Sequence, residues 1–426
     1  MKRNPLKIAI FLDYGWLGRA LRLISDFARY LSQRHKVDVY TSCQAMDIPD
    51  FKAFFSSLPS CKVIPIEKKR ILLKNSIYGL LSFPALCFNL HLLKSFYRNV
   101  ANEIDRQGYD IVLLDFGIDY FGHIPYIFDK LKAPVVYYCH EPNREIFEKR
   151  LFEDQNHNYR NKNRLQRIAY KMRYNYLSFY FRRNDQRSFK KIAAVLCNSY
   201  YTREYLYQTN SIFAWVSYPG VDVDRFQPLD TPCENLVLTV GELSARKRQD
   251  FIIRALSFIP AGLRPRLAIV YPQDNKFKDY LQKLAYDCNV NLEFHRHISD
   301  DDLIRLYNRA KLTLQASLME PFGLVPVESL SCGTPVVAVC EGGVRETIIN
   351  GQTGILVQRD PESFAQKVQY LLENEPVRLS MARQARQDAL ARWSIKEAVD
   401  RLEGYLYAVV EGKISNNEYL NTVKPF

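Results

Sequence analysis

Residues 317 to 357 constrain the fold of this chain more than any other stretch of its sequence. The stretch opens with the turn-forming residues Ser317 to Gly323, and the apolar spacing of Leu324 to Leu330 then predicts a short helix. Cys332-Gly333-Thr334-Pro335 ends that helix, because Gly tolerates a left-handed cap and Pro cannot continue a helix. The β-branched run Val336 to Val339 is typical of a buried strand.

A second turn, Glu341-Gly342-Gly343, follows this strand, and a helix is expected to begin near Val344. The stretch therefore predicts a loop, a helix, a strand, a loop and a helix, with both loops near strand ends. Ligands bind at that edge of an open parallel sheet, so we expect a ligand site here. The length of 426 residues favours two domains of about 200 residues each.

The loop before the first predicted helix is suited to bind negative charge. Free backbone N–H groups and the helix dipole attract anions there, typically phosphate. Glu320 and Glu328 lie beside this site, and their carboxylates are better suited to accept hydrogen bonds from the hydroxyls of a sugar or ribose. The alternative is ordinary, with one acid near a helix start and one solvated acid on the helix. The pattern thus favours a ligand that has both phosphate and hydroxyl groups.

Glu320-Pro321-Phe322-Gly323-Leu324, followed by Glu328 eight residues after Glu320, resembles the E-x7-E motif of the GT4 family of retaining glycosyltransferases. The resemblance implies a GT-B fold, which is an α/β fold of two doubly wound Rossmann-like domains that face across a cleft. It is detailed over residues 216–395 and diffuse over the first 215. Further matching positions in the same stretch are Ser317, Gly333, Pro335-Val336-Val337, Gly342-Gly343, Glu346, Gly351 and Gly354-Ile355-Leu356-Val357.

The family's domain organisation, placed on this sequence, gives an N-terminal acceptor-binding domain over residues 1–218 and a hinge over residues 219–231. A C-terminal nucleotide-sugar-binding domain follows over residues 232–395. A last helix, Ile395 to Val410, is expected to cross back, so that residues 396–415 pack on the first domain.

Three cations between a predicted strand, Leu236 to Val240, and the next helix place positive charge by the expected phosphate site. The family pattern is Gly-Arg-Leu, three variable residues and Lys. Lys247 matches the Lys of this pattern, and Glu242 occupies the position of its Arg. Arg246 is a candidate to supply the positive charge that this Arg would have provided. The alternative is that these cations form an ordinary solvated helix start without a ligand. The resemblance implies that Glu320 holds sugar hydroxyls and Glu328 the ribose. It further implies that the backbone of Gly241, Phe322, Gly323 and Leu324 lies at the donor and that Lys247 and Arg246 neutralise its diphosphate.

The start of the chain predicts a strand over Leu6 to Leu12, a helix over Arg19 to Gln33 and a second strand over Val37 to Thr41. The fingerprint G-x-G-x-x-G is not present, so a nicotinamide enzyme is not supported. In the turn between the first strand and helix, Gly18 matches the second Gly of the family's Gly-Gly pair, and Leu17 replaces the first.

His140 follows another predicted strand, Ala133 to Cys139, and begins the sequence His140-Glu141-Pro142. A His at the exit of a buried strand is placed for ligand contact. The sequence is similar to the His-x-Pro of many GT4 enzymes, whose His lies near the transferred sugar. A structural His that caps the strand is the alternative.

The formal net charge of +13 favours an anionic partner, such as a nucleotide ligand, an acidic lipid surface or nucleic acid. The nine Cys residues form no C-x-x-C pair, so we expect reduced thiols in the cytoplasm. Lys2 and Arg3 precede only five clearly apolar residues, Ile8 to Leu12, which is too short for a signal peptide.

No metal is expected. Asp222-Val223-Asp224 formally spells the D-x-D signature of another transferase fold, but it lies in the predicted hinge and is interpreted as a turn. Asp300-Asp301-Asp302 is interpreted as a helix start.

Residues 71–97 are the most apolar region outside a plain strand. Residues 77–93 approach transmembrane length, but Pro84, Asn89 and His91 interrupt them, so an amphipathic helix pair is predicted rather than a span. Residues 144–191 are strongly basic, with aromatic residues interleaved. Both regions also suit ordinary surface or core-packing helices. The functional interpretation is peripheral membrane contact through residues 77–97 and 160–191.

The resulting hypothesis is a retaining, metal-independent glycosyltransferase of hexosyltransferase type that needs no cofactor. It would move a sugar from a UDP- or GDP-sugar to a hydroxyl of a lipid-linked or cell-surface glycan, in polysaccharide biosynthesis at the inner face of the membrane. His140, Glu320, Lys247 and Arg246 are its candidate catalytic residues. A sugar-nucleotide epimerase or hydrolase of the same fold is the alternative. A nucleic-acid-binding protein would leave the Glu-rich motif unexplained, so no nucleic-acid partner is expected.

Overall fold

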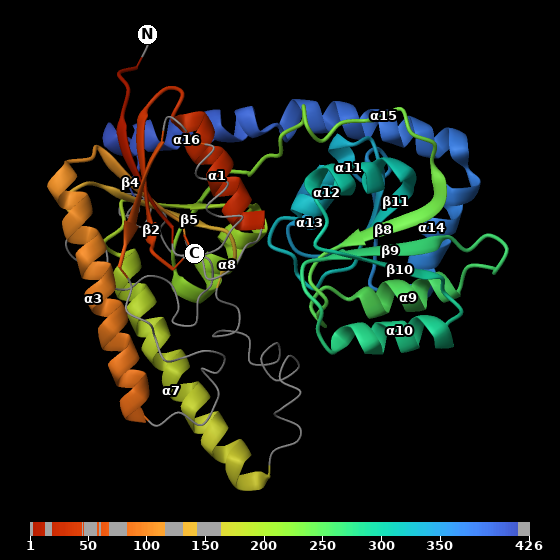
Figure 1. Cartoon of the computed structure of the whole chain (residues 1–426), viewed down its shortest axis with the longest axis horizontal. Coiled ribbons are helices and arrows are strands. Elements are labelled where there is room, and N and C mark those ends of the chain that lie inside the picture. Colours follow the sequence, from red (N-terminus) through yellow and green to blue (C-terminus); the bar gives the residue numbers. More distant parts are fainter. Residues whose placement is uncertain are drawn as a thin grey trace, which may run out of the picture. The chain divides into compact units, whose positions relative to one another are not determined.

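The computed structural model describes residues 3–12, 19–44, 46, 58, 61–67, 83–115, 131–142 and 163–415. The chain divides into two compact units, each built on a parallel β-sheet (Figure 1). Unit 1 comprises residues 1–217 and 399–426, and unit 2 comprises residues 218–398. The predicted hinge, residues 219–231, falls in unit 2 and stays a prediction.

The sheet of unit 1 has the strand order β3-β2-β1-β4-β5-β6-β7, and all its pairs are parallel. The order reverses between β1 and β4, which makes this a doubly wound sheet. Every residue of β4, β5 and β6 is buried, as expected for strands that helices cover on both faces. The strands are β1 (Lys7–Leu12), β2 (Lys36–Ser42), β3 (Cys61–Ile66), β4 (Ile111–Asp115), β5 (Val135–Cys139), β6 (Ala194–Cys197) and β7 (Trp215–Val216).

The helices described in unit 1 are α1 (Arg19–Leu31), α3 (Phe83–Gln107), α7 (Arg164–Phe189), α8 (Tyr200–Asn210) and most of α16 (Ile395–Val410). Helix α16 begins in unit 2, and its residues from Val399 onward belong to unit 1. There the carboxylate of Glu403 lies 2.7 Å from His35 Nε2, and the hydroxyl of Tyr407 donates to the carbonyl of Asn4.

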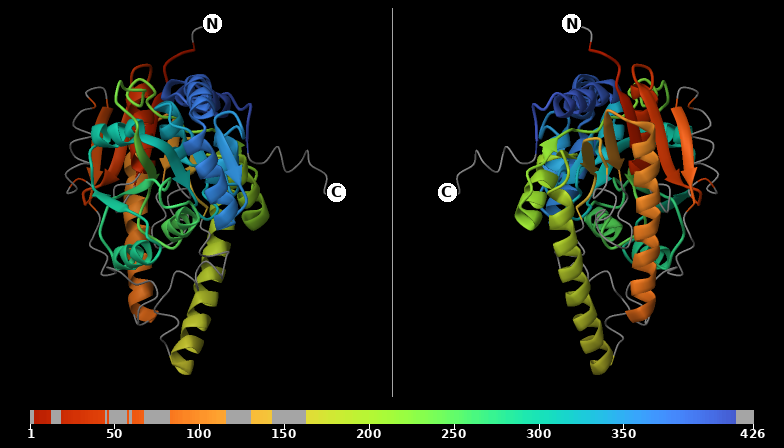
Figure 2. Two further views of the ribbon diagram at one scale, coloured as in Figure 1. Left: turned by 90° about the vertical axis from the view of Figure 1, so that its right-hand side faces the viewer. Right: turned by 90° about the vertical axis from the view of Figure 1, so that its left-hand side faces the viewer.

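Helices α3 and α7 are long compared with the strands that they lead into. The 26 residues of α7 extend about 39 Å, whereas the five residues of β5 extend about 17 Å. Both helices end near the amino ends of the strands that follow them, β4 and β6. Their N-terminal halves therefore reach past the carboxyl edge of this sheet (Figures 1 and 2).

The sheet of unit 2 has the order β10-β9-β8-β11-β12-β13, again parallel throughout and reversed between β8 and β11. Its strands are β8 (Glu234–Val240), β9 (Arg266–Tyr271), β10 (Leu292–Arg296), β11 (Ala310–Gln315), β12 (Val336–Val339) and β13 (Gly354–Val357). Its helices are α9 (Gln249–Ser257), α10 (Phe277–Asp287), α11 (Asp300–Arg309), α12 (Leu324–Ser331), α13 (Val344–Thr347), α14 (Pro361–Glu373) and α15 (Glu375–Arg392).

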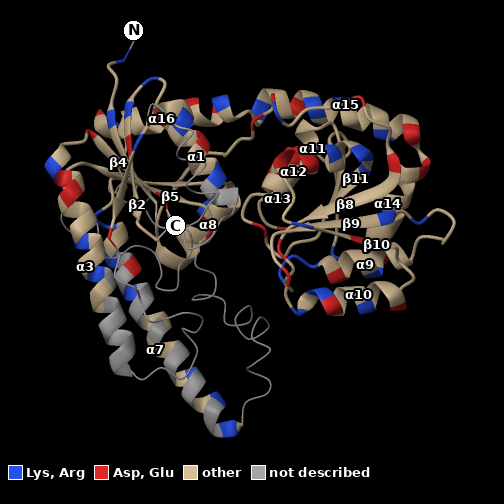
Figure 3. Cartoon of the chain, viewed as in Figure 1, with Lys and Arg blue, Asp and Glu red and all other residues tan. Residues whose placement is uncertain are grey.

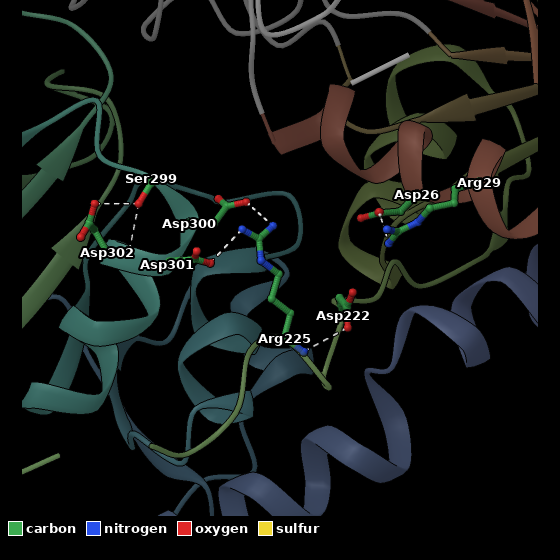
Figure 4. Close-up of polar contacts among 8 residues, drawn as sticks. All are labelled: Asp26, Arg29, Asp222, Arg225, Ser299, Asp300, Asp301 and Asp302. Carbon is green, nitrogen blue, oxygen red and sulfur yellow. Dashed lines mark hydrogen bonds and ion pairs between the residues drawn. The ribbon is translucent and has the colours of Figure 1, made fainter. Parts of the chain in front are cut away.

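The two acidic runs lie in a turn and at the start of α11, as predicted (Figure 4). Asp222 Oδ1 accepts hydrogen bonds from the backbone N–H groups of Asp224 and Arg225, which closes a turn. The guanidinium of Arg225 pairs with Asp300 at 2.7 Å and Asp301 at 3.0 Å at the start of α11. Within unit 1, Arg29 of α1 pairs with Asp26 one turn earlier.

The predicted helix pair over residues 71–97 stays a prediction, because the structure describes this range only from Phe83 onward. Residues 71–82 lie outside the described residues, and from Phe83 onward α3 is one continuous helix. Pro84 is the second residue of α3, where no backbone N–H is needed for the helix, so it does not interrupt the helix.

Three strands of the two sheets carry weak strand signals in their sequences. Strand β3 contains Pro65, which an edge strand tolerates, and β3 lies at the edge of its sheet. Strand β7 has two residues, and β13 begins with Gly354.

The N-terminal cap of α8 provides a test of unit 1. Ser199 Oγ accepts a hydrogen bond from Thr202 N at 2.9 Å. Ser199→Ala leaves that N–H without its acceptor, so we expect the free energy of unfolding to fall by about 1 kcal/mol. Urea unfolding of the full chain measures this. Ser32→Ala is the control, because its hydroxyl donates to the carbonyl of Arg29 and caps no helix start. Equal losses in both variants would contradict the capping role.

Candidate functional site

The candidate site of unit 2 lies at the carboxyl edge of its sheet, where the strand order reverses. Strands β8 and β11 are neighbours there, although about 70 residues separate them in the sequence. The loop after β8 carries the predicted cations, and the loop after β11 carries Glu320. The N–H of Leu318 donates to the carbonyl of Arg246 at 2.8 Å, which joins the two loops directly.

Lys247 and Glu320, both predicted as site residues, form an ion pair across these loops. Lys247 Nζ lies 2.7 Å from Glu320 Oε2, and the two side chains are 15% and 18% exposed. The Lys247 side chain crosses over Gly241, where a Cβ atom would lie 3.3 Å from it. Gly241 thus leaves the room that Lys247 needs to reach Glu320.

Arg246 lies beside Glu242, the residue in the position where the family has Arg. Arg246 Nη2 is 3.4 Å from Glu242 Oε1, and the hydroxyl of Ser244 also donates to that oxygen. The Nε2 group of Gln249 holds the Glu242 carbonyl at 2.8 Å. The carboxylate therefore offsets part of the charge that Arg246 brings to the edge.

The loop that carries Glu320 is packed against the glycine pair after β12. The N–H of Gly343 donates to the carbonyl of Glu320 at 2.7 Å. A Cβ atom on Gly342 would lie 2.4 Å from that same carbonyl oxygen, and one on Gly343 would lie 2.1 Å from the carbonyl oxygen of Pro321. Only glycine allows this approach of backbone to backbone.

Arg359, which the sequence analysis did not single out, joins the carboxyl ends of three neighbouring strands. Its guanidinium pairs in bidentate fashion with Glu341, after β12, at 2.8 and 2.7 Å. It also donates to the carbonyls of Ala316 and Ser317, after β11, at 2.8 and 3.1 Å. Arg359 itself follows β13 by two residues. A local sequence motif could not have predicted the role of Arg359, because its partners are distant in sequence.

The predicted helix after this loop is α12, and no side chain caps its N-terminus at Gly323. Gly323 has φ of +103°, a conformation that favours glycine. Phe322 is buried and packs against the rings of Tyr218 and Trp393. The backbone of Phe322, Gly323 and Leu324 is thus held in place by an aromatic cluster beneath the uncapped helix start.

Glu328, the second acid of the motif, lies one turn into α12 and is 3% exposed. The hydroxyl of Tyr307 donates to Glu328 Oε2 at 2.8 Å. At the end of the same helix, burial and the nearby Glu328 carboxylate raise the pKa of the Cys332 thiol. Cys332 is thereby kept protonated and unreactive.

In unit 1, His140 follows β5, as predicted, and contacts a buried carboxylate that the sequence analysis did not identify. His140 Nε2 lies 2.6 Å from Oδ2 of Asp115, the last residue of the neighbouring strand β4. Asp115 is fully buried. The amide of Asn198, which follows β6, donates to the His140 carbonyl at 2.6 Å. Asp115 therefore orients the imidazole, and Asn198 holds the backbone that carries it.

Gly18 lies outside the described residues. In the part of the chain that the structure describes, no three His, Cys, Asp or Glu side chains are grouped so that they could hold a metal ion. Over the same residues, no helix combines the length and apolar character needed to cross a membrane.

The unit 2 edge therefore combines a cation, a carboxylate and an uncapped helix start around rigid glycine-rich loops. Such a site can bind an anionic group at Lys247 and the helix start and accept hydroxyl hydrogen bonds at Glu320. The unit 1 edge offers one oriented imidazole.

Two family models match the chain in succession. The model for Glycosyltransferase Family 4 matches residues 20–225, and the model for Glycosyl transferases group 1 matches residues 221–388. The chain belongs to the GT4 family of group 1 glycosyl transferases.

Curated relatives match over part of their length. D-inositol 3-phosphate glycosyltransferase 1 of Catenulispora acidiphila is 31% identical over 216 residues, 46% of this chain and 51% of that protein. D-inositol 3-phosphate glycosyltransferase of Mycolicibacterium smegmatis is 32% identical over 208 residues, 44% of this chain and 45% of that protein. The chain thus spans about half the length of the curated relatives it matches.

Solved structures share the fold over nearly the whole chain. HepE of Anabaena, solved in complex with UDP and glucose, has a TM-score of 0.69 at 18% identity, covering 95% of this chain and all of HepE. WaaG, a glycosyltransferase involved in lipopolysaccharide biosynthesis, has a TM-score of 0.65 at 18% identity, covering 94% of this chain and 99% of WaaG. The predicted GT-B fold class is confirmed.

The glycine pair provides a test of the loop packing. In Gly343→Ala the new Cβ atom cannot fit 2.1 Å from the Pro321 oxygen, so the Glu320 loop must move. We expect a loss of about 3 kcal/mol in the free energy of unfolding. Gly262→Ala is the matched control, since a Cβ atom there meets nothing within 4 Å. A loss in Gly343→Ala no larger than in this control, by urea unfolding, would contradict the packing argument.

Arg359 provides a second test, with amide hydrogen exchange as its measurement. Arg359→Ala leaves the carbonyls of Ala316 and Ser317 without this donor, so we expect exchange over residues 317–323 to accelerate by about tenfold. Arg264→Ala is the matched control, because Arg264 donates to carbonyls elsewhere in unit 2, including those of Ile259 and Cys288. Equal acceleration over residues 317–323 in both variants would show that Arg359 has no specific effect on this loop.

Proposed function

We propose that this chain is a retaining glycosyltransferase that moves a hexose from a UDP- or GDP-sugar to a hydroxyl of an acceptor, without a metal. The observation that carries the proposal is the pairing of Lys247 with Glu320 at the strand reversal of unit 2, beside the uncapped start of α12. This arrangement supplies positive charge for a diphosphate and a carboxylate for sugar hydroxyls within one small region. Membership of the GT4 family supports the same activity.

Charge stabilisation at the leaving group is the main demand of the reaction. The bond between sugar and diphosphate breaks with positive charge on the sugar and negative charge on the diphosphate. Lys247, with the N–H groups at the start of α12, would stabilise that negative charge without movement of the loop backbone, because backbone contacts already hold the loops in place. Lys247 would then exchange Glu320 for a phosphate oxygen. Arg246 would contribute less than Lys247, because Glu242 offsets its charge.

Glu320 and Glu328 would bind hydroxyl groups of the donor. Glu320 is partly exposed at the edge and, once Lys247 turns to the phosphate, can accept hydrogen bonds from the sugar. Glu328 already accepts one hydrogen bond from Tyr307, which orients its carboxylate, and its proposed partner is the ribose. Neither residue is proposed as a nucleophile.

His140 would act through its orientation. Its Nε2 atom faces the buried Asp115, so the ring is fixed and its Nδ1 atom remains for a substrate contact. The proposed role is contact with the transferred sugar.

The proposed acceptor is a lipid-linked or cell-surface glycan, and the proposed location is the inner face of the membrane. The net charge of +13 and the apolar and basic segments at residues 77–97 and 160–191 support peripheral membrane contact. The curated relatives named for transfer to D-inositol 3-phosphate support a hydroxyl-bearing acceptor.

Thermal stabilisation by a panel of UDP-, GDP- and ADP-sugars, with and without magnesium, tests the donor. A ligand at 100 times its Kd stabilises the folded state by about 2.7 kcal/mol. We expect a clear rise in Tm with one nucleotide class, independent of magnesium. In Lys247→Ala we expect the affinity to fall at least about tenfold, because a charge-assisted hydrogen bond is lost.

Lys278→Ala is the matched control, because Lys278 pairs with Asp274 in a similar way elsewhere in unit 2. It should bind the donor as the unchanged protein does. No stabilisation by any sugar nucleotide would overturn the proposed function, and equal losses in the two Lys variants would remove Lys247 from the site. Release of free sugar with no transfer to any glycan would indicate a hydrolase instead.

A further inference from the structure

Helix α7 exposes a row of large apolar side chains. Ile168, Met172, Tyr176 and Phe179 are 49%, 68%, 50% and 64% exposed. At about 100° per residue, these four positions fall within an arc of about 80° on the helix surface. Exposure of single apolar residues is common, but a continuous row along one helix face indicates a surface that contacts something apolar.

Cations flank this exposed row. Helix α7 contains seven Lys and Arg residues and a single carboxylate, that of Asp185, which is buried. Figure 3 shows Lys and Arg along α7, including its far N-terminal end. The cations with exposed side chains in the described part are Arg164, Arg167, Lys171, Arg183 and Arg187. The exposed row therefore has a group of positive charges toward each end of the helix.

The row lies at and beyond the carboxyl edge of the sheet of unit 1. Phe179 is ten residues before the end of α7 at Phe189, which is about 15 Å, close to the length of a strand in this sheet. Ile168 lies about 17 Å further out. His140 and Asp115 mark the same carboxyl edge. The exposed row thus lies on the side of unit 1 where its strands end in polar residues.

We propose that α7 is a membrane-docking helix, which lies along an anionic phospholipid bilayer with the exposed row inserted among the acyl chains. A row of apolar side chains bracketed by cations is complementary to a surface with negative headgroups above an apolar interior. Ile168 and Met172 favour lipid over nucleic acid, because bases bind through stacking on aromatic rings. A helix in this orientation would bring the carboxyl edge of unit 1 to the membrane surface.

This inference deepens the proposed function, because it names the surface and the lipid class through which a lipid-linked acceptor would be reached. Vesicle binding does not require sugar transfer, so the two proposals can fail separately. Each variant below is also assayed for sugar-nucleotide stabilisation, which depends on unit 2.

Co-sedimentation of the full chain with vesicles tests the proposal. The vesicles are phosphatidylcholine alone and phosphatidylcholine mixed with an equal amount of phosphatidylglycerol. We expect binding to the anionic vesicles to be at least about tenfold tighter, and to weaken as salt is raised. The double variant Met172→Asp with Phe179→Asp should lose at least about tenfold in affinity, because two buried apolar groups are replaced by charges. Lys171→Gln should lose about fivefold, the effect of one cation at the surface.

Tyr286→Asp is the matched control, because Tyr286 is 87% exposed on α10 of unit 2 and should not contact the bilayer. Since all substituted side chains are exposed, the variants should keep the far-UV circular dichroism and Tm of the unchanged protein. Equal binding to both vesicle types, or no difference between the double variant and Tyr286→Asp, would overturn the proposal. So would tight binding to single-stranded RNA that the double variant loses, without binding to vesicles.

Discussion

The carboxyl edge of unit 2 is held together by direct contact between two backbone segments, which leaves no room for a side chain between them. Gly342 and Gly343 lie directly against the backbone of residues 319–322, and the Gly343 N–H holds the Glu320 carbonyl. Because this contact fixes the Glu320 loop, the Glu320 carboxylate has one place from which to pair with Lys247. The uncapped start of α12, at Gly323, follows directly after this loop, so its position depends on the same contact.

Each of the three cations discussed at this edge lies beside a carboxylate: Lys247 with Glu320, Arg246 with Glu242, and Arg359 with Glu341. These pairs differ in what they can do. Arg359 is bound on several sides and joins strand ends, so its contribution is rigidity. Lys247 has a flexible side chain with one carboxylate partner at 2.7 Å, so in the proposed reaction it can exchange that partner for a phosphate.

Much of this arrangement could be predicted from sequence. The strand and helix alternation follows from apolar periodicity, and the glycines, Glu320 and Lys247 stand in motifs whose members are close in the chain. Asp115 and Arg359 could not be predicted in this way. Asp115 ends an ordinary buried strand and gains its meaning only from His140 on the neighbouring strand.

The sequence by itself determined much of the order of strands and helices, the turn chemistry and the family, because these depend on local spacing and on residues that only certain backbone conformations allow. It also determined the charge and aromatic content of α7. The tertiary structure decided which side chains meet. Parallel sheets bring the ends of strands that are distant in sequence to one edge, and so create the Lys247–Glu320, His140–Asp115 and Arg359 contacts. It also decided that α7 extends past the strands of its sheet. The packing of the helix against the sheet sets where the ends of the helix lie relative to the ends of the strands.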